Sequence, residues 1–198
     1  MSKLIHGVGY NSKTKYPTSE NGRISTAYSQ WRGMIERCYD INRSKKNKSY
    51  IDCDVSSEWH DFQNFAEWFY NQDYNDMGYE LDKDLLAKGN RVYGPENCRL
   101  VPRELNILLL NRQSHRGAYP QGVDFNKASG KFRARVKNNG KSKSLGYFDC
   151  PNRAYQEYKL AKERYVKNTA LAWANRVDWD VFLALMNWTL DSSNNEPR

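Results

Sequence analysis

Apolar side chains recur at helical spacing between residues 24 and 40. The members of this stripe are three or four positions apart, which predicts a helix with one buried face. They are Tyr28, Trp31, Ile35 and Cys38. Ser25 or Thr26 stands where a side chain can cap the first turn.

A second helix is predicted after Ser56 or Ser57, either of which can serve as its N-cap. Its apolar stripe consists of Trp59, Phe62, Phe65, Ala66 and Phe69. Aromatic stripes at this spacing are typical of a protein core, so we interpret them as core rather than as a surface for stacking on bases.

The stretch YELDKDLLAKGNRVYGPENCRLVPRELN, residues 79–106, combines a short apolar strand, a Gly-Asn turn and the start of a helix at Pro102. Asp82 and Asp84 belong to the strand, and alternation would place them on one face. A carboxylate is unfavourable in such a strand unless it is paired, hydrogen-bonded or bound to a metal ion.

Strict alternation of apolar and basic residues marks the segment KFRARVK. Phe132, Ala134 and Val136 would face one side of a strand, and Lys131, Arg133, Arg135 and Lys137 the other. Turns at KASGK and NNGK make this the middle of three antiparallel strands; Tyr147 in the third could lie on either face.

Two more helices are predicted toward the C-terminus. One begins at Pro151 with Asp149 as a cap, and its buried stripe would be Ala154, Tyr158, Ala161 and Tyr165. The other presents Trp179, Phe182, Leu183 and Met186.

The predicted fold class is α+β. An N-terminal helical unit precedes a three-stranded antiparallel sheet packed on one helix, and a C-terminal helix ends the fold. The expected parts are a flexible arm (1–22), the first domain (23–111), a linker (112–117), the sheet domain (118–170), the C-terminal helix (171–190) and a disordered tail (191–198).

The positive charge of the chain is concentrated in one segment. Residues 112–168 contain fourteen Lys or Arg and four Asp or Glu, whereas the rest contains 17 basic and 19 acidic residues. Such asymmetry is typical of a module that binds a polyanion. Four cations on one face of a strand repel one another, but in a duplex groove each can neutralise a phosphate.

The remaining composition restricts the setting of the protein. The four cysteines, Cys38, Cys53, Cys98 and Cys150, lack CxxC spacing, so neither structural zinc nor a disulfide framework is expected. No apolar run is long enough for a membrane span and no signal peptide is evident. We expect a cytoplasmic protein without a membrane partner; a monomer is slightly favoured.

The segment from YPQGVDF to AKERY, about residues 118–168, resembles the Apetala-two-type (AP2) DNA-binding domain of plant ethylene-response factors and phage endonucleases. The matching pieces are the G-V opening, GKFRARV, LGYFD and a helix rich in Ala and Tyr. The resemblance implies that the sheet lies in the major groove of double-stranded DNA. Arg133 and Arg135 are then expected to contact bases, and Lys131, Lys137, Lys141 and Lys143 to contact phosphates.

Residues 25–111 resemble phage HNH-type endonucleases in the order of YSQWRGMIERCYD, DCDVSSEW, LDKD and YGPENCRLVP. The resemblance implies an HNH-like ββα finger in the first domain, in which Asp82 and Asn106 are metal ligands and Asn97 is the loop asparagine. Oxygen ligands suit Mg²⁺ or Mn²⁺. Such a cation would stabilise charge on the scissile phosphate.

The chain departs from the HNH pattern at the general base. Lys83 occupies the position of the usual His, and an ordinary lysine is protonated at neutral pH. Asp84 is the nearest alternative base or metal ligand. His60 is either a remote base or a surface residue, and His115 and His6 are the remaining histidines. Alternatively, Asp82 and Asp84 pair with Arg91, Arg99 or Arg103 in a finger without metal.

These observations predict a metal-dependent DNA endonuclease. The two resemblances imply that it is of the homing type, is encoded by a bacteriophage and acts in the bacterial host cytoplasm. The alternative is a catalytically silent DNA-binding protein, a regulator or counter-defence factor, and an RNA-binding domain is a third reading. The recognition site, the choice between a nick and a double-strand break, and the biological role are not evident from the sequence.

Overall fold

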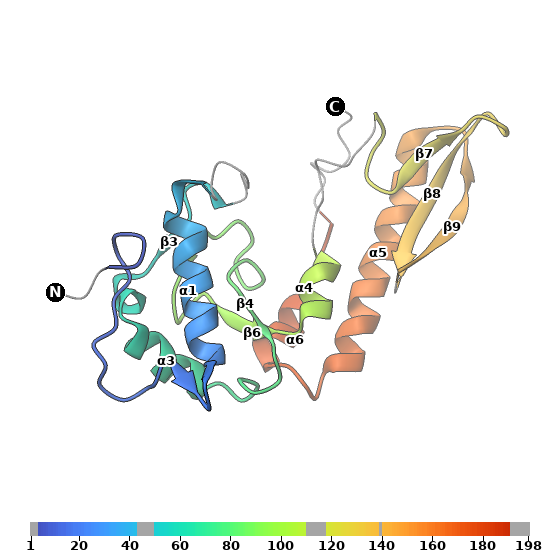
Figure 1. The fold of residues 1–198 in the computed structure, drawn as a ribbon. Coiled ribbons are helices and arrows are strands. Elements are labelled where there is room, and N and C mark those ends of the chain that lie inside the picture. The colour runs from blue at the N-terminus through green and yellow to red at the C-terminus, as the bar shows by residue number, and fades with distance from the viewer. Residues whose placement is uncertain (1–3, 43–49, 110–117, 139, 191–198) are drawn as a thin grey trace. The chain divides into compact units, whose positions relative to one another are not determined.

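The computed structural model describes residues 4–42, 50–109, 118–138 and 140–190 (Figure 1). It is an α+β protein, as predicted. The chain forms two compact units. The first comprises Met1–Asn106 and Asn175–Val181, and the second comprises Ile107–Ala174 and Phe182–Arg198. The predicted linker at 112–117 and the tail at 191–198 lie outside the described residues.

Helix α1 (Thr26–Tyr39) is the first helix of the first unit. Ser25 caps it, as the sequence suggested, by accepting a hydrogen bond from the Tyr28 backbone N–H (3.3 Å). Trp31 and Ile35 of the predicted stripe are fully buried. The Trp31 indole N–H donates to the Trp59 carbonyl (2.7 Å), which joins α1 to the next aromatic segment.

The predicted second helix is divided in two. A short 3₁₀ helix, η2 (Ser57–His60), precedes α3 (Phe62–Tyr70). The cap of α3 is Asp61, whose carboxylate accepts from the Gln63 N–H (3.1 Å), and not Ser56 or Ser57 as expected. The aromatic stripe from Trp59 to Phe69 is buried, which confirms its assignment to the core.

The N-terminal segment is anchored to α3, although we predicted a flexible arm. The buried Gln63 side-chain oxygen accepts from the N–H groups of Lys15 (2.9 Å) and Tyr16 (2.7 Å). Its amide nitrogen donates to the Asn11 side chain (2.7 Å) and the Tyr16 carbonyl (2.9 Å). This part of the chain thus satisfies its backbone groups through one side chain distant in sequence. A two-stranded sheet of β1 (Ser19–Glu20) and β2 (Arg23–Ile24) follows.

Two small pairs of strands complete the first unit. Strand β3 (Asp54–Val55) pairs in parallel with β5 (Val92–Tyr93). Strand β4 (Glu80–Asp82) pairs antiparallel with β6 (Arg99–Val101), and helix α4 (Arg103–Leu109) follows β6 directly. The strands β4 and β6 with α4 therefore have the predicted ββα order.

The second unit contains an antiparallel sheet in the order β7-β8-β9. The strands are β7 (Val123–Asn126), β8 (Lys131–Asn138) and β9 (Lys141–Phe148). One face packs on α5 (Pro151–Trp173), where Ala134 and Val136 are buried together with Tyr155 and Tyr158. Pro151 begins the helix as predicted, but the N-cap position is Cys150 and not Asp149.

The last helix, α6 (Trp179–Met186), buries a different side from the one predicted. Val181 and Leu185 are fully buried, whereas the Trp179 side chain is 69% exposed and Leu183 is exposed. No helix in the described parts of the chain combines the length and the apolar character that crossing a membrane requires.

Candidate metal site and candidate nucleic-acid interface

The candidate metal site lies on β4, in the first unit. Strand alternation puts Glu80 and Asp82 on one face of β4, opposite the buried side chain of Leu81. Leu81 is paired with Leu100 of β6, which is also buried and helps to hold the strand in place. Both carboxylates are therefore fixed to a short but well-packed pair of strands.

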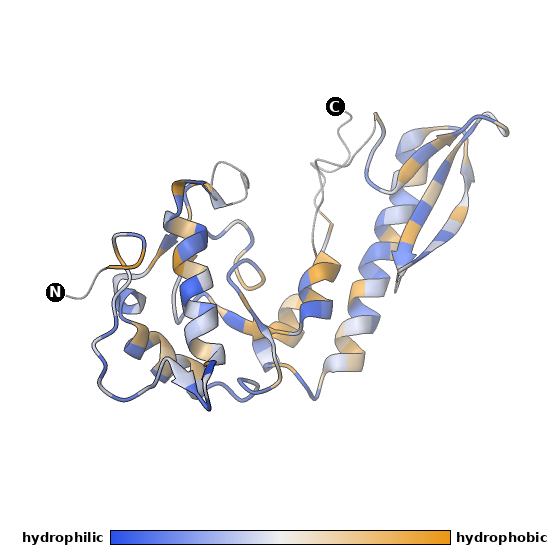
Figure 2. Cartoon of the chain, in the orientation of Figure 1, coloured by the Kyte–Doolittle hydropathy of each residue, from blue (hydrophilic) through white to orange (hydrophobic). Residues whose placement is uncertain are grey.

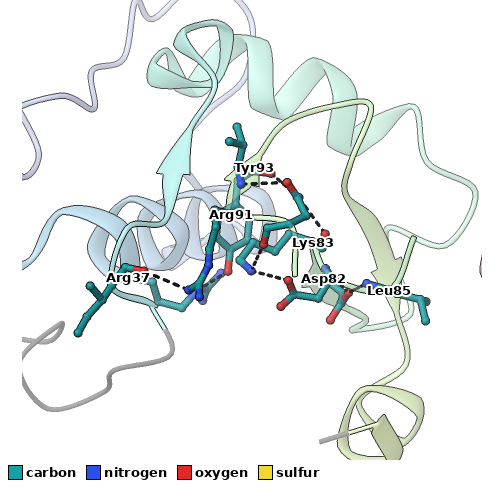
Figure 3. A network of polar contacts seen from close by, with 10 residues as sticks. Arg37, Asp82, Lys83, Leu85, Arg91 and Tyr93 are labelled. Carbon is teal, nitrogen blue, oxygen red and sulfur yellow. Dashed lines mark hydrogen bonds and ion pairs between the residues drawn. The ribbon is translucent and has the colours of Figure 1, made fainter. Parts of the chain in front are cut away.

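The Asp82 side chain ends the strand. Its Oδ1 accepts hydrogen bonds from the N–H groups of Asp84 (2.9 Å) and Leu85 (2.7 Å) (Figure 3). Its Oδ2 accepts none from the described residues. Burial raises the pKa of the Asp82 carboxyl, and the two backbone hydrogen bonds counteract this only in part. A nearby cation would favour the ionised form of such a carboxylate.

Asn106 of α4 approaches the face of β4 that carries Asp82. Its Nδ2 donates to the Glu80 Oε2 (3.0 Å), and the Arg103 Nε lies 3.7 Å from the Glu80 Oε1. The sequence analysis did not include Glu80, although its spacing of two from Asp82 on a strand was a signal for it. The structure thus places Asn106 against Glu80, and Glu80 is on the same face of β4 as Asp82.

Lys83 points away from this face and is only 5% exposed. Its Nζ donates to the Asp84 Oδ1 (2.7 Å) and to the Asn90 carbonyl (2.7 Å), and lies 5.7 Å from the centre of the Tyr93 ring (Figure 3). These contacts are those of an ammonium group that holds a loop together. They do not suit a proton acceptor.

Asp84 lies outside the strand, because β4 ends at Asp82, where the carboxylate accepts hydrogen bonds from the two N–H groups that follow. The prediction that alternation places Asp84 on the face of Asp82 is therefore wrong. Its carboxylate is exposed and forms an ion pair with Lys83. Neither aspartate forms an ion pair with an arginine within the described residues.

The three arginines proposed as partners of these aspartates make other contacts. Arg99 binds the Asp180 carboxylate (2.6 Å), and the Arg91 guanidinium donates to the Ile51 carbonyl (3.1 Å). Arg103 approaches Glu80. The alternative of a finger held by arginine–aspartate pairs is thus wrong for Asp82 and Asp84.

Asn90 holds together the loop between β4 and β5. Its Nδ2 donates to the carbonyls of Lys83 (3.0 Å) and Val92 (2.7 Å), and its Oδ1 accepts from the Val92 N–H (3.1 Å). The predicted loop residue, Asn97, contributes a backbone hydrogen bond to Gly94 (3.2 Å), and in the described structure its side chain makes none. The Gly-Asn turn was the signal that could have pointed to Asn90.

His60 is engaged elsewhere in the unit. Its Nε2 lies 3.1 Å from the Val55 carbonyl and 3.3 Å from the Tyr39 hydroxyl, which itself donates to the Asp54 carboxylate. His115 lies outside the described residues. Among the described residues, therefore, no histidine contacts Asp82.

The donors at β4 suit a hard cation better than zinc. Within the described ranges no three His, Cys, Asp or Glu side chains form a group that could hold a metal ion, and the donors at β4 and Asn106 are oxygen atoms rather than the sulfur and nitrogen typical of structural zinc. Two carboxylates and one amide fit Mg²⁺ or Mn²⁺, since Mg²⁺ is commonly held by one or two carboxylates and retains several waters.

The candidate nucleic-acid interface is the outer face of the sheet in the second unit, defined as the face turned away from α5. Alternation along β8 is as predicted: Ala134 and Val136 are buried, and the basic residues between them are on the outer face. Figure 2 shows the change between hydrophilic and hydrophobic positions along the strand. The basic residues of the outer face are Lys131, Arg133, Arg135 and Lys137.

The pairing of β9 with β8 decides the position of three further residues. Tyr147 is opposite Arg133, so it belongs to the outer face, and it is 48% exposed. A β-bulge between Ala134 and Arg135 shifts the pairing, so that Lys143 lies opposite Val136. Lys143 and, by alternation, Lys141 are thus on the other face of the sheet from Arg133, and the six predicted DNA contacts do not form one surface.

An acidic residue that the sequence analysis did not consider lies among the cations. Asp124 of β7 is opposite Arg133, and its Oδ2 lies 2.8 Å from the Arg133 Nη2. The Arg135 Nε lies 2.7 Å from the Asp124 Oδ1. Burial disfavours the charged carboxylate, but the two arginines outweigh it and lower the pKa of Asp124.

Comparison of the chain with protein-family models, curated protein sequences and solved structures gave no match. The resemblances to HNH endonucleases and to Apetala-two-type domains therefore stay predictions.

Proposed function

We propose that the protein binds double-stranded DNA through the outer face of its sheet and cleaves it in a reaction that requires Mg²⁺ or Mn²⁺. The observation that carries the binding part is the row of four cations on the outer face of β8, of which Lys131, Arg135 and Lys137 are exposed and Arg133 is partly buried. A groove lined by phosphates offers each of them a partner, and the major groove admits a strand pair.

The observation that carries the cleavage part is the contact of Asn106 with Glu80, on the strand face that also carries Asp82. The Asp82 Oδ2, the Glu80 carboxylate and the Asn106 amide oxygen would hold the cation. A cation held there would supply charge stabilisation to the scissile phosphate and the departing oxygen.

The chain's own groups have separate tasks in this proposal. Asp84 follows Asp82 by two residues and has an exposed carboxylate, and we assign to its Oδ2 the proton of the attacking water. Lys83 holds the Asp84 Oδ1, so that the carboxylate stays beside the turn. The homing-type, phage-encoded form of this nuclease is proposed from the family resemblance alone.

A plasmid assay tests the proposal. Wild-type protein should nick or linearise supercoiled plasmid with Mg²⁺ or Mn²⁺ and not with EDTA. Asp82→Asn, Glu80→Gln and Asn106→Ala should abolish cleavage while the affinity for duplex DNA is retained. Cleavage that persists in all three variants would refute the assignment of the site.

A second candidate function is a DNA-binding protein without chemistry. This function is favoured by Lys83, which occupies the usual position of the base, is buried and donates hydrogen bonds to both the Asp84 carboxylate and the Asn90 carbonyl. Wild-type protein that binds duplex DNA but cleaves no plasmid with either cation would support this function. Competition between duplex DNA and RNA at one salt concentration separates both candidates from an RNA-binding protein.

A further inference from the structure

Asp124 is an anion in the middle of the basic outer face. Its two carboxylate oxygens contact two guanidinium groups, with distances of 2.8 Å to Arg133 and 2.7 Å to Arg135. The three side chains are 31%, 28% and 45% exposed, so the cluster lies at the surface where a ligand can reach it. Because the arginines lower its pKa, Asp124 is charged at neutral pH.

This arrangement is unfavourable for a surface that only attracts phosphates. The carboxylate repels an approaching phosphate and occupies two of the four cations of the outer face. It suits the reading of bases. Arginine contacts guanine through two donors at once, and a carboxylate accepts from the amino group of cytosine.

The hydrogen bonds leave suitable donors unused. Asp124 engages Nε of Arg135, and within the described residues the two terminal nitrogens of this guanidinium have no partner. A guanidinium held along one edge loses less side-chain entropy when its other edge binds a base.

We propose that Asp124 is a specificity-determining residue, which orients Arg133 and Arg135 toward base edges and disfavours binding to random sequence. The inference rests on the proposed binding of duplex DNA by the sheet. It assigns a role to Asp124, which belongs neither to the predicted DNA-contacting cations nor to the candidate metal site.

The experiment uses the full chain and a pool of duplexes with a randomised central segment. Sequences are selected with wild-type protein, Asp124→Asn and Asp124→Ala, and the affinity of each protein for unselected duplex is measured in parallel. The matched control is Asp149→Asn, which removes the same charge from the same unit; among the described residues the ion pair of Asp149 is with Lys131 (3.1 Å) and not with an arginine. Circular dichroism confirms that each variant is folded.

Asp124→Asn should bind unselected duplex about fivefold more tightly, as expected for the loss of one nearby like charge at low salt. Its preference for the selected site over unselected duplex should fall by about tenfold or more, the scale of one good arginine–guanine contact. Asp149→Asn should keep the wild-type selected sequence. Folded Asp124 variants that select the same sequence with the same preference as wild type would overturn the inference.

The failure of the proposed function has a different signature. If duplex affinity is unchanged in Lys137→Ala and Arg135→Ala, the sheet is not the DNA-binding surface, and the role of Asp124 falls with it. If both variants lose affinity but Asp124→Asn keeps full preference, only the inference about Asp124 is wrong.

Discussion

Gly122, which precedes β7, lies where the backbone and the core of the second unit both exclude a side chain. Its φ is +77°, and a Cβ at this position would lie 2.1 Å from the Tyr158 Cδ2. Gly130, in the turn between β7 and β8, has a similar φ of +66°, but a Cβ there would meet no atom within 4 Å. The two glycines therefore separate the backbone requirement from the packing requirement.

Gly122→Ala should destabilise the second unit by about 3 kcal/mol. A left-handed conformation costs an alanine about 1–2 kcal/mol, and overpacking in a core adds about 1–3 kcal/mol. Gly130→Ala should show only the first of these costs, about 1 kcal/mol. The clash is with a ring that is 6% exposed, so Tyr158 cannot move into solvent without opening the core.

Urea denaturation followed by circular dichroism gives the two free energies of unfolding. Hydrogen exchange of amides in β8 and α5 shows whether the loss falls on the second unit. Tyr158→Ala provides a further check: in that background Gly122→Ala should cost no more than Gly130→Ala. Equal destabilisation by the two glycine substitutions in the wild-type background would refute the reasoning.

Three further predictions concern side chains with few exposed atoms. Lys162 donates to the Leu108 carbonyl (2.6 Å), and burial lowers its pKa from 10.5 to about 8. Between these pH values the unfolded chain keeps a proton that the folded chain has lost, so this group makes the free energy of unfolding rise with pH. Urea denaturation at a pH below and a pH above this range should show a smaller rise in Lys162→Met than in wild type. An unchanged rise would contradict the lowered pKa of Lys162. Gln63→Ala should release the N-terminal segment and cost about 1–3 kcal/mol, because backbone groups lose their partner; faster hydrogen exchange of the amides of residues 15 and 16 checks it, and unchanged protection would contradict it. Lys83→Met should lower the free energy of unfolding, measured by urea denaturation, by about 1–3 kcal/mol, because the turn after β4 loses its hydrogen bonds to Lys83. An unchanged unfolding midpoint would mean that the contacts of the Lys83 ammonium group do not contribute to stability.

Part of the fold could be predicted because it depends on local periodicity. The buried stripes of α1 and α3 and the alternation along β8 follow from repeats of about 3.6 and 2 residues, which any window of the chain displays. The prediction for Asp84 failed because of a turn: the Asp82 carboxylate accepts hydrogen bonds from the N–H groups of Asp84 and Leu85, and β4 ends before Asp84.

The candidate sites were predicted less completely. Asp82 and the basic residues of β8 could be selected by residue type and spacing, whereas Asn106 was selected only through the resemblance to HNH-type endonucleases. Glu80, Asn90 and Asp124 were missed, since each becomes informative only through a partner brought close by folding. The positions of Lys141 and Lys143 depended on a β-bulge that alternation alone does not reveal.

The sequence by itself determined which residues of α1, of the aromatic stripe in η2 and α3 and of β8 face a core, and that positive charge gathers in the second half of the chain. Only the tertiary structure decided that Gln63 anchors the N-terminal segment, that Asn106 meets Glu80 and that one aspartate joins two arginines on the basic face. The physical reason is that a periodic pattern reports the surroundings of a residue within its own helix or strand. The pairing of particular side chains depends on strand register and on packing between segments that are distant in the chain.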